Sequence, residues 1–366
     1  MNSRYLARLE SDIHLALDPI SRSHLRAEHA GYLARLGRIQ EAREEIRQIR
    51  DEQRGAGSIR LAILVNIADG LCHYFEDMGP ESRDRFLRAF SLAAAGEQDD
   101  LQSRAASWLA LYSYGTYDFV GMVRYLRGAL SKKSSLDAAT KSRFCMLLAL
   151  TAHLANRFDI ASAWYQKSRR YAAEIEDEVT LSALMHNMAS IWTANLRNEA
   201  LGGIETKDKS RTALTGAMST MNFDHLVGAL GLNYFTPLIR AQLFSLEGEY
   251  ENALELYSAN LGVLNLRSVK GWQSWLLADR GWCHLRLGNV REGKEDLAKA
   301  QASISNDHHI DDQAATLKRL SDCYSMLGDD NESSTLVARS NSCWSQFIDL
   351  QGEMLERVGE FSEADI

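Results

Sequence analysis

The chain has 366 residues, of which only 3 are proline and 24 are glycine. Apolar residues make up 45% and charged residues 25%, which is the composition of a globular protein. This composition argues against proline-rich linkers, collagen-like sequence and turn-dense β-sandwiches. Because a proline inside a helix costs about 3 kcal/mol, so few prolines favour long, uninterrupted helices.

The charge balance bears on the class of partner. Acidic residues outnumber basic ones by 49 to 41, and no basic run stands out, so we expect no nucleic-acid partner. The 5 cysteines are far apart and are expected to be buried free thiols, which fits a reducing compartment. With neither a signal-peptide core nor an apolar window of about 18 residues, we expect a cytoplasmic chain without a membrane partner.

The N-terminal residues 1–20 are expected to form a capping helix. Their apolar residues recur at helical spacing from Tyr5 to Leu17, and Pro19 ends the pattern. This helix should pack against the first helix pair of the segment that follows.

Residues 21–332 repeat one pattern: an apolar helix, a short turn, and an amphipathic helix with a small residue near its start. Two weaker copies turn at Gly115 and Gly328, and two more turns are needed near Asp77 and Leu196. The turns then recur about every forty residues, apart from one longer interval that we interpret as an insertion near 197–225. The four clear copies turn at Gly37, Asn156, Gly248 and Gly288.

The small residues give this pattern a physical reason. One of them follows each clear turn by five positions and another precedes it by seven, as Ala42 and Ala30 do around Gly37. Such residues let the two helices of a pair approach closely. A single pair cannot bury its apolar faces, so successive pairs must stack.

This spacing of glycine, small and aromatic residues resembles the tetratricopeptide repeat (TPR) family, in a long-helix bacterial form. The resemblance covers about residues 22–345, and the period exceeds the roughly 34 residues usual for the family. It implies an all-α fold, a right-handed α-solenoid of about eight antiparallel helix pairs. The proline that often follows the second helix in this family is absent, which leaves the boundaries between repeats open.

Residues 333–366 are expected to form a long C-terminal helix. Its heptad-spaced apolar residues fit either a cap on the last repeat or a coiled coil that forms a homodimer. In bacterial signalling proteins of similar layout, such a helix leads into a diguanylate cyclase or kinase domain. The heptad positions are Val337, Trp344, Ile348, Leu355 and Val358.

The sequence carries few signals of catalysis. Motifs for phosphate loops, dinucleotide binding, zinc proteases and serine hydrolases are absent, so we expect neither an enzyme nor a cofactor. The stretch NDHHIDD, with His308, His309, Asp311 and Asp312, is interpreted as a solvated loop and helix start, and no metal site is expected.

Two sets of residues are candidates for ligand binding. Asn66, Asp69 and His73 share one face of an apolar helix and form either a ligand-binding stripe or an internally hydrogen-bonded one. In the TPR family the first helix of each pair lines the concave groove. The residues that this implies for the groove, unless they pack against neighbouring helices, are Tyr112, His153, His186, Gln242, Trp275 and Trp282.

The sequence is compatible with two functions. The first is a non-catalytic scaffold that binds a protein or peptide in the concave groove, with tryptophans as anchors. The alternative is a sensory module of a bacterial signalling protein, in which a ligand acts through the C-terminal helix on a cyclase or kinase domain. An enzyme with Asp69 orienting His73 as a base is the least favoured reading, because no nucleophile accompanies the pair.

Overall fold

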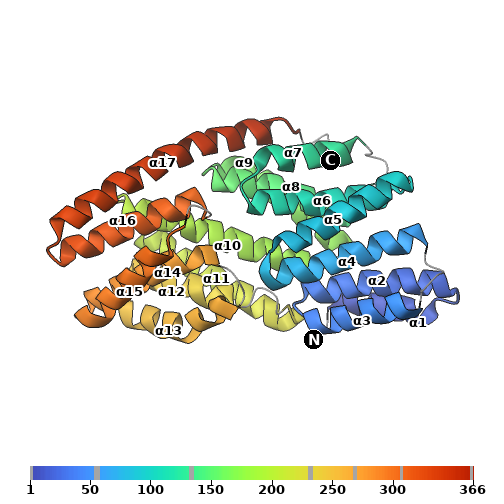
Figure 1. Cartoon of the computed structure of the whole chain (residues 1–366), viewed down its shortest axis with the longest axis horizontal. Coiled ribbons are helices and arrows are strands. Elements are labelled where there is room, and N and C mark those ends of the chain that lie inside the picture. The colour runs from blue at the N-terminus through green and yellow to red at the C-terminus, as the bar shows by residue number, and fades with distance from the viewer. Residues whose placement is uncertain are drawn as a thin grey trace.

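The computed structural model describes residues 3–52, 58–131, 136–229, 234–266, 270–305, 308–362 and 366. Within these ranges the chain forms 17 helices and no strand, which confirms the expected all-α fold (Figure 1). The first helix, α1 (Arg4–Leu15), precedes eight antiparallel helix pairs. The described chain is therefore an α-solenoid of the predicted size.

The pairs follow one another along the chain without interruption. They are α2 (Pro19–Arg35) with α3 (Ile39–Glu52), α4 (Ile59–Asp77) with α5 (Pro80–Ala95), α6 (Asp99–Gly115) with α7 (Phe119–Leu130), α8 (Ala138–Leu154) with α9 (Phe158–Glu174), α10 (Glu178–Leu201) with α11 (Lys207–Val227), α12 (Phe235–Glu247) with α13 (Tyr250–Leu266), α14 (Lys270–Arg286) with α15 (Val290–Ser303), and α16 (Ile310–Met326) with α17 (Asp330–Gly359). Each first helix also packs on the first helix of the next pair.

Left-handed residues end most first helices, as the sequence predicts. The four clear turns and Gly328 all have positive φ, between 58° and 83°. The turn assigned to Gly115 is centred two residues later, on Tyr117 at φ 57°, and the one near Asp77 is on Met78 at φ 54°. Glycine, or asparagine at 156, accepts this conformation at little cost.

The fifth turn differs from the prediction. Instead of ending near Leu196, α10 continues to Leu201, and the left-handed residue is Gly203. Most of the residues expected to form an insertion, 197–225, lie in α10 and α11, which are 24 and 21 residues long. The extra length is thus mostly helical, because this polar stretch contains no proline to stop a helix.

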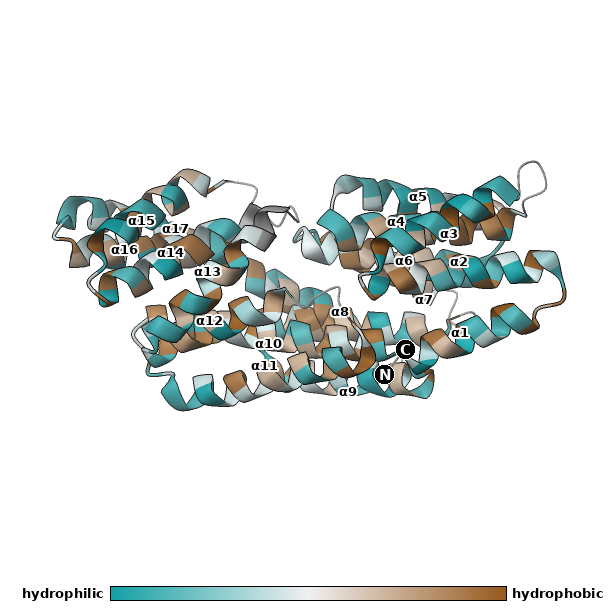
Figure 2. Cartoon of the chain, turned by 90° about the horizontal axis from the view of Figure 1, so that it is seen from below, coloured by the Kyte–Doolittle hydropathy of each residue, from teal (hydrophilic) through white to brown (hydrophobic). Residues whose placement is uncertain are grey.

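Small residues bring the helices of each pair together. In the first pair, Ala30 and Ala42 are both fully buried. In the α14–α15 pair the backbones are closer still: a Cβ added to Gly281 or to Gly293 would lie 3.3 Å from the carbonyl oxygen of the other. The predicted role of these residues in packing is confirmed. Figure 2 shows the hydrophobic residues gathered where helices face one another.

The array curls so that its two ends reach its middle. At the start, the carboxylate of Glu178 on α10 accepts the Ser3 hydroxyl at 2.7 Å and the backbone N–H of Arg4 at 3.1 Å. At the end, α17 crosses to α7 and α8, where Gln351 donates to the carbonyl oxygen of Leu154. Both ends of the array thus contact helices of its middle.

The C-terminal helix is long, as predicted, but it buries a different stripe. Of the expected heptad residues, Val358 is buried, whereas Ile348 is 63% exposed. The buried positions are rotated by about one residue because α17 packs against α16 and α8 within its own chain. They are Leu336, Ser340, Phe347, Met354 and Val358. A homodimer through this helix remains a prediction, and its surface would be the side that carries Ile348.

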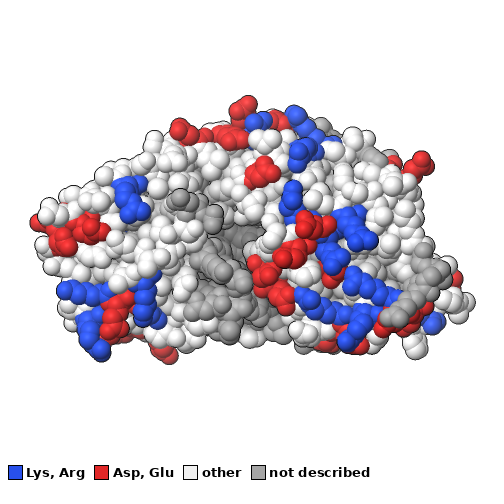
Figure 3. Space-filling model, in the orientation of Figure 1, with Lys and Arg blue, Asp and Glu red and all other residues white. Residues whose placement is uncertain are grey.

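Charges of both signs are interspersed over the face seen in Figure 3, with no large field of one sign on that face. No helix among the described residues is both long enough and apolar enough to cross a membrane.

Replacing Glu178 with alanine should release α1. The variant loses the acceptor for the Ser3 hydroxyl and for two backbone N–H groups, so we expect a loss of about 1–3 kcal/mol of stability. Hydrogen exchange followed by mass spectrometry should show faster exchange over 4–15 and little change in α2. The control is Glu176→Ala, which removes only partly exposed ion pairs to Arg4 and Arg8. Unchanged exchange of α1 in Glu178→Ala would contradict this account.

Candidate functional site

The solenoid contains a partly open cavity of about 950 Å³. Its lining comes from the first helix of every pair, from α2 to α16, from the turns that follow α4 and α6, and from residues before α12 and α16. Among the described residues, the only lining residue on a second helix is Ser303, at the end of α15. The groove that the resemblance implies is therefore present, and the first helices form its wall.

Three of the nine predicted site residues line this cavity: His186 on α10, Gln242 on α12 and Trp275 on α14. His186 and Gln242 are 4% exposed and Trp275 is 9% exposed. They come from three successive first helices, which lie side by side in the wall.

Each of these three side chains has a buried polar atom that finds no hydrogen-bond partner among the described residues. The atoms are Nδ1 of His186, Nε2 of Gln242 and Nε1 of Trp275. Such atoms are rare in folded proteins, because each one costs the free energy of removing a polar group from water. These three atoms belong to residues that line the cavity, and other atoms of the same kind, for example in Gln102 and Tyr257, lie elsewhere in the described chain.

The orientation of His186 is fixed by a buried carboxylate. Its Nε2 donates to Asp224 on α11 at 2.5 Å, and the Ser182 hydroxyl donates to the other oxygen of the same carboxylate at 2.6 Å. In a neutral ring with this tautomer, Nδ1 carries no hydrogen and is an acceptor. Beside it on α10, Asn187 also lines the cavity, with only a long contact of 4.0 Å to the sulfur of Met146.

Aromatic side chains make up much of the remaining wall. Tyr74 and Trp108 lie on the side formed by α4 and α6, and Phe235 and Trp272 lie opposite, on α12 and α14. Phe235 and Trp272 contact each other, with ring centroids 4.4 Å apart. Large, rigid aromatic rings of this kind offer apolar contact at a small cost in conformational entropy.

Three arginines also line the cavity. Arg35 pairs with Asp177 at 2.9 Å, and Arg197 pairs with Asp312 at 3.0 Å. The third, Arg143 on α8, donates to the Ser107 hydroxyl and has no carboxylate within ion-pair distance in the described part of the chain. The sequence gives no signal for this residue, because Arg143 follows Lys141 and Ser142 at the end of a polar stretch, where a charge is expected to face water.

The start of α16 closes one side of the cavity. The Tyr117 hydroxyl donates to Asp311 at 3.0 Å, and the Tyr117 ring stacks on His309 at 3.8 Å. His309 also donates through Nε2 to the carbonyl oxygen of Gly115. These contacts join the α6–α7 turn to the far end of the array, so the segment is not the solvated loop that we expected from the sequence.

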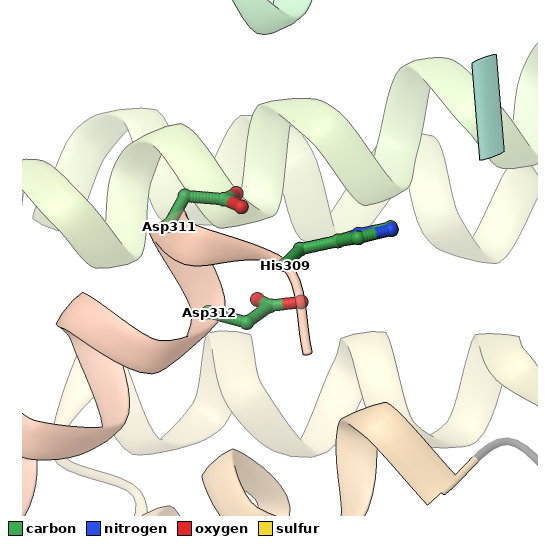
Figure 4. Close-up of side chains that lie close together, drawn as sticks. All are labelled: His309, Asp311 and Asp312. Atoms are coloured by element: carbon green, nitrogen blue, oxygen red, sulfur yellow. The ribbon is translucent and has the colours of Figure 1, made fainter. Parts of the chain in front are cut away.

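His309, Asp311 and Asp312 lie together at this closure (Figure 4). One potential metal-ligand atom of each lies within 4.8 Å of the others. All three side chains already have partners within the chain: Gly115, Tyr117 and Arg197. We therefore interpret the group as a structural contact between the two halves of the solenoid.

The other predicted site residues lie outside the cavity. On α4, the face that carries Asp69 packs toward α3 and α5, where Asp69 pairs with Arg50 and Arg85 at 2.9 and 3.0 Å. Asn66 donates to the carbonyl oxygen of Ala62, and His73 lies 3.9 Å from Asp69. The polar stripe is thus internally bonded, which was the alternative to a ligand-binding stripe.

Tyr112, His153 and Trp282 also miss the cavity. Tyr112 follows the lining residue Leu111 by one position, which rotates its side chain away from the cavity. His153 faces α9 and hydrogen-bonds the Tyr165 hydroxyl at 3.1 Å. Burial lowers the pKa of His153 to about 4, so its ring is neutral near pH 7. Trp282 packs between the guanidinium groups of Arg286 and Arg319.

Comparison with known proteins bears on the fold. No family model and no curated protein matches the chain. Among solved structures, a Rap protein in complex with competence and sporulation factor is similar, with a TM-score of 0.58 and 12% sequence identity. The match covers 96% of this chain and 92% of that one. This likeness shows the fold, a TPR-like helical-repeat array.

The contact between the α6–α7 turn and the start of α16 should contribute to stability in a way that depends on pH through Asp311. Burial, and then the adjacent Asp312 carboxylate, raise the pKa of Asp311 from 3.8 to about 6. The folded state therefore holds this proton more tightly than the unfolded chain, and the stabilising effect disappears as pH rises through about 6. Asp311→Asn keeps an acceptor for Tyr117 and should raise stability by about 1–3 kcal/mol at pH 7.5, but not below about pH 4.

Thermal unfolding at the two pH values measures this difference. The control is Asp312→Asn, which leaves buried Arg197 without its carboxylate and should destabilise the protein at pH 7.5. An effect of Asp311→Asn that is equal at both pH values would contradict the assigned titration.

Proposed function

We propose that the chain is a non-catalytic binding protein that holds a short peptide, in an extended conformation, inside the solenoid. The observation that carries this proposal is the cavity of about 950 Å³, whose wall combines aromatic rings such as Phe235 and Trp272 with the amide side chains of Asn187 and Gln242. A peptide backbone presents N–H and C=O groups at regular intervals and supplies both donors and acceptors to such amides.

The size and surface of the cavity fit such a ligand. A volume of about 950 Å³ is near the upper end of the range for enclosed small-molecule sites, about 300–1,000 Å³. Aromatic walls with a few polar groups favour a ligand with alternating apolar side chains and backbone amides. A folded protein domain is too large for this space, so a protein partner would contribute a short segment.

The solved neighbour supports a binding role. The Rap protein, whose fold covers nearly the whole of both chains, was solved in complex with competence and sporulation factor. A helical array of this length is therefore compatible with holding a ligand. The proposal for this chain still rests on the residues of its own cavity.

A second candidate is a sensory module, favoured by the path of α17. This helix is paired with α16, whose first residues line the cavity, and it reaches α8 through the Gln351–Leu154 hydrogen bond. A ligand that changed the curvature of the array would also move α17. Only this second candidate function includes an output domain of cyclase or kinase type.

A random hexapeptide library tests the first proposal. The wild-type protein should retain a subset of the peptides on gel filtration, identified by mass spectrometry. The Trp275→Ala variant should bind a retained peptide at least about tenfold more weakly, because it loses both aromatic area and the indole N–H.

Trp282→Ala provides a matched control. Trp282 lies two turns from Trp275 on α14, is partly buried and does not line the cavity. We expect the affinity of the Trp282→Ala variant for the same peptide to stay within about twofold of that of the wild type. Retention of no peptide, or equal losses in the two variants, would count against the cavity as the binding site.

A further inference from the structure

Arg143 is a buried cation in the cavity wall, with no ion pair to a carboxylate within 4.0 Å among the described residues. It lies on α8, is 5% exposed and lines the cavity. Its Nη1 donates to the Ser107 hydroxyl at 2.7 Å, and its guanidinium carbon lies 3.7 Å from the centroid of the Trp108 ring.

Other arginines in the same region have carboxylate partners. Arg35 and Arg197, which also line the cavity, each pair with an aspartate at about 3 Å. Arg104 on α6 bridges Glu28 and Asp137. For Arg143, no carboxylate within 4.0 Å is found in the described part of the chain.

The cost of this arrangement appears in the titration of Arg143. Burial, and then the positive charge of Arg35, lower the pKa of Arg143 to about 9, although the more distant carboxylates of Asp137 and Asp177 act in the opposite direction. A buried charge without a partner destabilises a folded protein, and removing it is often neutral or stabilising. The hydrogen bond to Ser107 and the contact with the Trp108 ring offset part of this cost, and a carboxylate in the cavity would offset more of it.

The contacts of Arg143 leave hydrogen-bonding capacity for a ligand. Trp108 covers one face of the guanidinium, and Ser107 accepts from one of its nitrogens. A guanidinium has five N–H donors in one plane, which match the two oxygens of a carboxylate.

We propose that Arg143 binds a carboxylate of the ligand in the cavity. This assignment rests on the proposed peptide-binding function and adds a chemical requirement to it. The carboxylate comes from the free C-terminus of the peptide or from an aspartate or glutamate side chain, because both present the same two oxygens to the guanidinium.

Three hexapeptide libraries test the assignment. The first has free C-terminal carboxylates and no acidic residue. The second is amidated at the C-terminus and has one aspartate or glutamate at a varied position. The third is amidated and lacks acidic residues. Each is incubated with the full chain, and retained peptides are measured by mass spectrometry after gel filtration.

The wild type should retain the first or the second library at least about tenfold more than the third. Preference for the first library assigns the C-terminal carboxylate, and preference for the second assigns an acidic side chain. Arg143→Met should lose the preference. Because this variant also loses the hydrogen bond to Ser107, thermal unfolding checks that it remains folded. Arg169→Met, on the exposed side of the neighbouring α9, is the control and should behave as the wild type.

Two results would overturn the assignment while leaving peptide binding intact: equal retention of the three libraries by the wild type, or a preference that survives in Arg143→Met. If Arg143→Met does not fold, Arg143→Lys replaces it in the test. This variant keeps the positive charge but loses the paired N–H donors of the guanidinium. An undiminished preference for carboxylate peptides in Arg143→Lys would overturn the assignment. Retention of no library by the wild type would remove both the assignment and the proposed function.

Discussion

The structure depends on the fact that a single pair of helices cannot bury its two apolar faces. Each pair must therefore stack on the next, and small residues such as Ala30 and Ala42 set how closely its two helices approach. Because every first helix turns one side inward, a curled array of eight pairs encloses a space that its side chains do not fill. The cavity is thus a consequence of the repeat, and the side chains on its wall decide what it holds.

Those side chains differ from the residues of a hydrophobic core, because several of them are polar or charged. Gln242 and Trp275 bury donors without partners, and Arg143 buries a charge without a counter-ion in the described chain. Each lowers the stability of the empty protein, and together they line one cavity. Binding sites commonly carry this kind of local cost, since a ligand that satisfies the groups recovers it.

The sequence was sufficient for the architecture because its signals are local. Gly37 and Gly288 mark turns that depend only on their own backbone, and the small residues lie at fixed distances from them. The rotation of each helix about its axis depends on how neighbouring helices cross, which no local pattern encodes. For this reason Trp275 lines the cavity, whereas Trp282, two turns along the same helix, does not. Arg143 was overlooked because its lack of a partner exists only in three dimensions.

The structure of the protein with a peptide recovered from the library tests the central claim most directly. The account predicts a peptide inside the solenoid, between α8, α10, α12 and α14, with backbone hydrogen bonds to Gln242 and Trp275. A peptide bound on the outer surface of the second helices, with the cavity unchanged, would contradict it.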